Sequence, residues 1–93
     1  MAESVVDITA RAREDLAFLS PDVARRISLK IRELAMDSRP RGDTIRRLSG
    51  FDIPTYRQRI GDYRAVFRVG PGVVWIFRII HRSRLDRTLE DLR

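Results

Sequence analysis

The 93-residue sequence contains no cysteine, a single histidine and a single lysine. The absence of cysteine excludes disulfide bonds, thiolate metal ligands and a cysteine nucleophile. The N-terminal segment lacks the basic start and apolar stretch of a signal peptide, and the longest apolar run, residues 73–80, is interrupted by Arg78. We therefore expect a soluble cytoplasmic protein with no membrane-spanning segment, no metal site and no cofactor.

Acidic side chains are almost missing from residues 56–82, which carry six arginines and only Asp62, a net charge of +5. Residues 1–55 carry ten basic and nine acidic side chains, and residues 83–93 carry three of each. Nearly all of the net charge of +6 therefore lies in one segment. Such a concentrated basic surface indicates an anionic partner: a nucleic acid, an acidic protein or an anionic membrane. The alternative is a solvated face in a chain that uses arginine freely.

The N-terminal half of the chain predicts a strand followed by two helices, in a single domain over residues 1–93. Residues 3–8 alternate weakly and are rich in β-formers, which predicts a short strand. Thr9 and Ser20 are suitable N-caps, and helically spaced apolar residues follow each of them. The second helix is expected to end near residues 37–39, because Pro40 follows. The short connection predicts an antiparallel helix hairpin that covers one face of a sheet.

The C-terminal half predicts that sheet. Three consecutive strands are expected at residues 55–60, 63–69 and 73–82, whereas residues 45–49 are ambiguous. Leucines at positions 85, 89 and 92 have helical spacing, so the chain ends in a short helix or a frayed end. The expected fold class is α+β: an N-terminal strand and a two-helix hairpin packed on a mainly antiparallel sheet.

The turns between these strands predict which way the arginines point. Gly61-Asp62 fits a type II′ hairpin, which places Arg59 opposite Arg64. A three-residue loop at 70–72 then places Arg64 opposite Arg78. Because side chains alternate between faces, one face would hold all the arginines of the segment, namely Arg57, Arg59, Arg64, Arg68, Arg78 and Arg82. The other face, against the helices, would hold Tyr63, Phe67, Trp75 and Phe77.

A row of arginines is costly, because like charges directly opposite one another destabilise a sheet. Slipping one strand by a residue would move its aromatic side chains into water and its arginines into the core. The pattern therefore favours a face that binds a polyanion, with a solvated charged face as the alternative.

Three stretches of the sequence resemble the RelE/ParE superfamily of toxin–antitoxin toxins. They are LSGFDIPTYRQRIGDYRAVFRV at residues 48–69, VVWIFRIIHR at 73–82, and VDITARAREDLAFL at 6–19. The GDYRAVFRV portion is the most specific. The resemblance covers nearly the whole chain and implies a RelE-like fold and neutralisation by a cognate antitoxin, expected to be acidic. For the RelE branch it implies cleavage of mRNA in the A site of the ribosome, with the ribosome and mRNA as partners.

The resemblance also implies roles for individual arginines. Arg57 and Arg59 match the family's basic pair, Arg64 matches the arginine of its GDYR signature, and Arg82 matches the basic residue that closes its last strand. In the family's reaction the RNA 2′-OH attacks the adjacent phosphate, and guanidinium groups can stabilise the charge that develops. The expected catalytic residues are Arg59, Arg64 and Arg82, and the expected RNA-binding residues are Arg57, Arg68 and Arg78.

The C-terminal segment departs from the family. Many RelE-like toxins carry a tyrosine five or six residues after the position of Arg82, whereas this chain has Arg87 and Thr88 there. The general base is therefore not identified by the resemblance. His81 falls on the core face by alternation, and Asp86 and Glu90 are weaker candidates.

Three functions remain open at the level of the sequence. The first is a ribosome-dependent mRNA endonuclease, favoured by the four matched basic positions. The second is a ParE-like inhibitor of DNA gyrase without catalysis, favoured by the missing tyrosine. The third is a non-catalytic RNA-binding module, because fold alone does not determine function.

Overall fold

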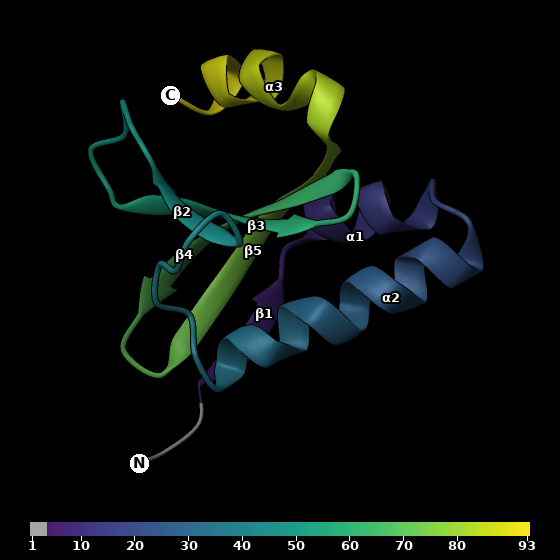
Figure 1. The fold of residues 1–93 in the computed structure, drawn as a ribbon, viewed down its shortest axis with the longest axis horizontal. Coiled ribbons are helices and arrows are strands. Elements are labelled where there is room, and N and C mark those ends of the chain that lie inside the picture. The colour runs from purple at the N-terminus through teal and green to yellow at the C-terminus, as the bar shows by residue number, and fades with distance from the viewer. Residues whose placement is uncertain (1–3) are drawn as a thin grey trace.

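The computed structural model describes residues 4–93 and contains a five-stranded sheet. The strand order is β1-β5-β4-β3-β2; β1 pairs with β5 in parallel, and all other neighbours are antiparallel (Figure 1). The α+β expectation is thus confirmed, and the ambiguous segment at residues 45–49 contains an edge strand, Ile45–Leu48. The predicted first residue of the N-terminal strand, Glu3, lies outside the described residues. The strands are β1 (Val5–Ile8), β2 (Ile45–Leu48), β3 (Thr55–Ile60), β4 (Tyr63–Gly70) and β5 (Val73–His81).

The helices lie on both sides of this sheet (Figure 1). On one side α1 (Ala10–Ala17) and α2 (Pro21–Arg32) form the predicted hairpin, with Thr9 and Ser20 as their N-caps. The second helix ends earlier than expected and continues as a 3₁₀ turn, Glu33–Ala35. On the other side lies α3 (Leu85–Leu92), which follows a second 3₁₀ turn, Arg82–Arg84. None of the helices in residues 4–93 is long and apolar enough to cross a membrane.

Each face of the sheet has its own apolar cluster. The larger cluster packs α1 and α2 against the sheet and includes the fully buried Phe67 and Ile76. The smaller cluster joins Leu89 of α3 to Val66 and Ile80, with Leu48, Phe51, Leu85 and Leu92 around it. The C-terminal leucines therefore form a packed helix, because their spacing places them along one face that covers this second cluster.

The β3–β4 register agrees with the sequence-based prediction. Ile60 pairs with Tyr63, and Arg59 lies directly opposite Arg64. Gly61 has φ +58°, and Asp62 is not among the residues with positive φ. A positive φ at the first turn residue alone is the requirement of a type II′ turn, which glycine meets without strain.

The β4–β5 register differs from the prediction, which was wrong about residues 73–77. Gly70 pairs with Val73, so the connection is a two-residue turn, with Gly72 at φ +72°. This one-residue difference reverses the faces of the first part of β5. A bulge opposite Val66 and Phe67 then shifts the register again, so that Arg64 pairs with Ile80 and not with Arg78.

The aromatic side chains of β5 consequently lie on the face that α3 covers. Trp75 pairs with Arg68, and the Phe77 ring centroid lies 5.0 Å from the Arg68 guanidinium carbon. The expectation that Trp75 and Phe77 pack against the helix hairpin is thus wrong. Phe67 does belong to the hairpin-side core, and Tyr63 packs against it, as predicted.

Candidate nucleic-acid interface

Four of the six predicted arginines gather around the β3–β4 turn and the end of β5. Arg57 and Arg59 lie on β3, Arg64 lies on β4, and Arg82 begins the 3₁₀ turn after β5. The backbone N–H of Arg82 donates to the Asp62 carbonyl at 2.8 Å, which joins this 3₁₀ turn to the β3–β4 turn. An open hollow of about 490 Å³ is lined by Arg57, Arg64, His81, Arg82, Ser83 and Leu85. We call Arg57, Arg59, Arg64 and Arg82 the arginine cluster.

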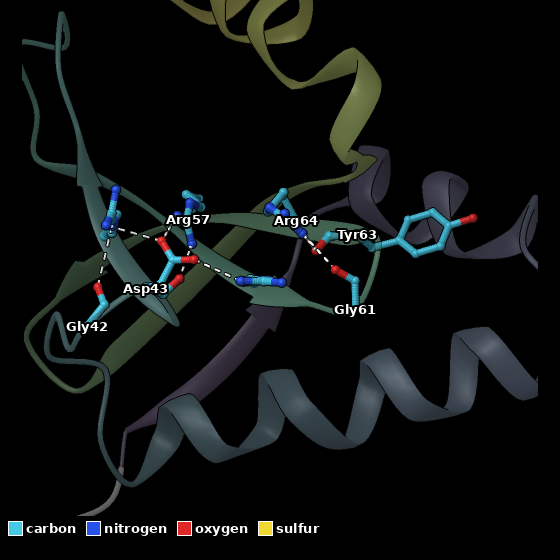
Figure 2. Close-up of polar contacts among 8 residues, drawn as sticks. Gly42, Asp43, Arg57, Gly61, Tyr63 and Arg64 are labelled. Atoms are coloured by element: carbon cyan, nitrogen blue, oxygen red, sulfur yellow. Dashed lines mark hydrogen bonds and ion pairs between the residues drawn. The ribbon is translucent and has the colours of Figure 1, made fainter.

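Arg64 is the member of the cluster without an acidic partner. Its Nη1 donates to the carbonyl oxygens of Gly61 and Tyr63, each at 2.9 Å (Figure 2). Among residues 4–93 its guanidinium forms no ion pair. Burial lowers the pKa of Arg64 from its usual value, and the positive charges of Arg57, Arg59 and Arg82 add to this effect. Arginine nevertheless remains protonated in proteins, so Arg64 presents a fixed, partly desolvated cation to an incoming anion.

Asp43 neutralises part of the same cluster from the loop before β2. Its carboxylate lies 2.8 Å from Arg59 Nη1, 3.3 Å from Arg57 Nη2 and 3.2 Å from Arg46 Nη2. Figure 2 shows the carboxylate directed toward this group of arginine side chains. The positive charge of Arg46 and hydrogen bonds from Arg59 and Arg57 lower the pKa of the Asp43 carboxyl group. Asp43 is therefore ionised at neutral pH and is a weak proton acceptor.

Sequence reasoning missed both Asp43 and Arg46. They lie in or next to the segment RPRGDT, whose composition predicts only a loop. No local spacing indicates that this loop reaches β3, because the contact depends on β2 forming as an edge strand. The backbone contact is direct, since the Arg59 N–H donates to the Thr44 carbonyl at 2.7 Å.

His81 ends β5 beside the hollow. Ser83 donates its backbone N–H to His81 Nδ1 at 3.2 Å, and the His81 ring meets the Tyr63 ring edge to face at 5.4 Å. Asp86 and Glu90 are exposed on α3 and are not among the residues that line the hollow. Of the three proton acceptors considered from the sequence, only His81 is thus adjacent to the arginine cluster.

The remaining two arginines are engaged elsewhere. Arg78 turns toward α1, where its Nε lies 2.8 Å from the Asp15 carboxylate; both side chains are less than one-fifth exposed. Arg68 donates to Thr55 Oγ1 at 3.0 Å, and its guanidinium lies near the rings of Phe51 and Phe77. The structure therefore does not bring Arg68 and Arg78 into the arginine cluster.

Comparisons with known proteins identify the family of the chain. The model of a family described as the ParE toxin of type II toxin–antitoxin systems matches residues 6–86. Nothing among curated proteins matches the sequence significantly.

Solved structures of several toxins share the fold. The archaeal RelE of a RelE–RelB complex from Pyrococcus horikoshii is 27% identical, with a TM-score of 0.72 over 90% of this chain and 99% of that one. The RelBE2 toxin–antitoxin complex from Mycobacterium tuberculosis contains a chain that is 28% identical, with a TM-score of 0.64 over 89% and 95%. A mutant RelE from Escherichia coli in the free state is 21% identical, with a TM-score of 0.73 over 97% and 94%, a likeness in fold alone.

Proposed function

Because this chain belongs to the ParE toxin family of type II toxin–antitoxin systems, within the RelE/ParE superfamily, we propose that it is a toxin that cleaves mRNA on the ribosome. The observation that carries this proposal is the arginine cluster, in which Arg64 has no acidic partner among residues 4–93. An inhibitor that acts only by binding a protein does not need several guanidinium groups around one open hollow, whereas phosphate chemistry does.

The proposed reaction is attack of an RNA 2′-OH on the adjacent phosphate, with departure of the 5′-oxygen. Negative charge builds on the non-bridging oxygens in the transition state, and preorganised cationic donors stabilise that charge. Arg64 suits this role because backbone carbonyls hold one of its nitrogens, while the rest of its fork meets no carboxylate in the described part of the chain. Arg59 and Arg82 would assist it, and Arg57 would bind the RNA backbone.

The deciding experiment exposes two targets to the same purified protein. mRNA-programmed ribosomes are incubated with the chain and new RNA ends are mapped by primer extension, while DNA gyrase is tested separately on relaxed plasmid. We expect ribosome-dependent mRNA ends and unimpaired supercoiling. Uncut mRNA together with blocked supercoiling would overturn the proposal.

Inhibition of DNA gyrase is the second candidate, and two observations favour it. The matching family model is named for ParE. Residues 83–93 also contain no aromatic side chain to stack on an mRNA base. In this alternative the arginine cluster would contact an acidic protein surface or DNA and would not act on a phosphate.

An acidic antitoxin is the proposed physiological partner. The two complexes cited above each pair a toxin of this fold with an antitoxin. The net charge of +6 favours an acidic, partly disordered segment that folds as it binds. Co-expression of the adjacent small reading frame is expected to restore growth and to yield a co-purifying complex. Persistent toxicity without a complex would contradict this.

A further inference from the structure

Asp43 is held in the arginine cluster by its backbone as well as by its side chain. The loop turns tightly at Gly42, which has φ +50°, and the Thr44 N–H donates to the Arg41 carbonyl at 3.2 Å. The Asp43 carbonyl accepts a hydrogen bond from Arg57 Nη1 at 2.7 Å. The loop is thus tied to β3 by contacts that do not involve the Asp43 carboxylate.

That carboxylate occupies a position suited to a phosphate. Three guanidinium groups converge on it, from Arg46, Arg57 and Arg59. Arg46 and Arg57 are directly opposite each other on neighbouring strands, as are Arg59 and Arg64. The site around Asp43 therefore continues the basic surface from Arg64 toward the β2 edge. Guanidinium forks bind carboxylate and phosphate through the same paired geometry.

We propose that the Asp43 carboxylate is an internal substitute for an RNA phosphate, which keeps Arg46, Arg57 and Arg59 in a binding arrangement until the RNA backbone displaces it. This inference rests on the proposed function in taking RNA as the displacing anion. The phosphate that replaces the carboxylate would lie beside the phosphate assigned to Arg64, so a bound strand would run from the hollow toward β2. Asp43 is a positioning residue in this scheme, and no proton is transferred to it.

Two physical consequences follow. The carboxylate relieves repulsion among three neighbouring cations when RNA is absent. It also competes with a phosphate for the same donors, so its removal should tighten anion binding. Because the neighbouring backbone bonds remain, Asp43→Asn should keep the loop in place while removing the negative charge.

The test compares Asp43→Asn with Asp22→Asn. The second variant changes the net charge by the same amount on exposed α2, where Asp22 forms an ion pair with Arg25 outside the arginine cluster. The probes are inorganic pyrophosphate and a single-stranded oligouridylate of about eight nucleotides, within the usual footprint of single-strand sites. Fluorescence anisotropy at several salt concentrations gives the affinity and its salt slope. We expect Asp43→Asn to bind the RNA at least about fivefold more tightly than Asp22→Asn at low salt, with a steeper salt dependence.

A second measurement needs no variant. In wild-type protein the carboxyl ¹³C signal of Asp43 should shift when RNA or pyrophosphate is added, while the signal of Asp22 stays in place. Equal affinities of the two variants, weaker binding by Asp43→Asn, or an unmoved Asp43 signal would each overturn the inference. Ribosomal cleavage by the wild type is scored separately. If the wild type cleaves mRNA but Asp43→Asn and Asp22→Asn bind RNA with equal affinity, only the inference about Asp43 is overturned. If Asp43→Asn binds RNA more tightly but the wild type does not cleave mRNA, only the proposed function is overturned.

Discussion

Arg64 and Arg78 lie on neighbouring strands of one sheet, yet their guanidinium groups have opposite surroundings. Arg78 is half-buried and paired with Asp15, which also accepts the Ile79 N–H at 2.9 Å. Within residues 4–93 the Arg64 guanidinium is held by backbone carbonyls alone and faces other cations. The first arrangement stabilises the native fold, because the charge, its partner and the nearby backbone donor are satisfied together. The second is unfavourable for the fold and is suited to receiving an anion.

The contrast shows that the arginines of residues 56–82 form two systems, which differ in whether their hydrogen-bond donors are already bonded within the fold. Toward the β3–β4 turn, the positive charges of the arginine cluster are only partly neutralised by carboxylates. Toward the β4–β5 turn, Arg68 is enclosed by Phe51, Phe77 and the buried Thr55. An arginine thus suits a binding site when its N–H donors are free, and it suits the scaffold when those donors are bonded to other groups of the fold.

The largest expected effect is on Arg64. Arg64→Ala should lower the rate of mRNA cleavage on saturated ribosomes by about 100-fold or more, the usual scale for losing a preorganised donor. Its melting temperature should be unchanged or higher, because the change removes a cation directly opposite Arg59. Single-turnover cleavage and thermal melts measure the two quantities. The control is Arg47→Ala, an exposed position on β2 directly opposite Tyr56 rather than one of the cluster arginines.

Cleavage at the wild-type rate by Arg64→Ala would remove the distinction between the two systems. So would a loss of activity that only follows a loss of folded protein. In either case Arg64 would belong with Arg78, as part of the scaffold.

Arg78→Ala should show the converse behaviour. It leaves the Asp15 carboxylate, 12% exposed, without its main cation, at a cost of about 2 kcal/mol in the free energy of unfolding, discounted for residual exposure. That corresponds to a melting temperature lower by roughly 10 °C for a domain of this size. Activity per folded molecule should stay near that of the wild type. Arg11→Ala is the matched control, because Arg11 reaches the same carboxylate from an exposed position at 3.9 Å.

The part of this contrast that sequence could reveal is the β3–β4 hairpin. Gly61-Asp62 admits one hairpin length, and on both strands the arginines occupy one alternating set of positions while most of the apolar residues occupy the other. A shift by one residue would turn Arg57 and Arg59 toward the hairpin-side core, so chemistry and turn geometry select one register. The predicted pairing of Arg59 with Arg64 is accordingly confirmed.

The β4–β5 hairpin could not be predicted in the same way. Its loop contains Gly70, Pro71 and Gly72, which allow either a two-residue or a three-residue connection. In the first part of β5 both alternating sets are apolar, with Val74 and Ile76 in one and Trp75 and Phe77 in the other, so hydrophobicity does not choose between them. The bulge carries no local signal. The role of Asp43 depends on contacts 14 and 16 residues along the chain, which sequence spacing does not reveal.

A smaller effect separates Arg57 from Arg68. Arg57→Ala should weaken association with programmed ribosomes most at low salt. The loss should shrink as salt rises, because the variant has one backbone-binding cation fewer and hence a shallower salt dependence. Arg68→Ala should leave association nearly intact and lower stability by about 1 kcal/mol, the worth of one hydrogen bond and a cation–π contact. Ribosome pelleting and urea melts separate the two outcomes. Equal loss of association in both variants would extend the RNA surface to the β4–β5 end.

The smallest expected effect is on the acid titration of Asp43. Its pKa is lowered mainly by the charge of Arg46, so Arg46→Ala should raise that pKa toward the usual value for aspartate. A carboxyl group with a depressed folded-state pKa contributes stability above its unfolded pKa, about 4, and loses it as the pH falls through the folded value. The wild type should therefore lose this contribution to stability below about pH 4. Arg46→Ala, in which the Asp43 pKa is less depressed, should lose less stability over the same pH range.

Carboxyl ¹³C titrations of the wild type, Arg46→Ala and the control Arg47→Ala measure this directly. Asp37 is an internal reference, since its pKa of about 2 is set chiefly by a hydrogen bond from Arg39 and not by the cluster. Only the Asp43 curve should move in Arg46→Ala, and neither curve should move in Arg47→Ala. If Asp43 titrates unchanged without Arg46, the third guanidinium does not share its carboxylate in solution. The anion position would then be built from Arg57 and Arg59 alone, and the basic surface would end at β3.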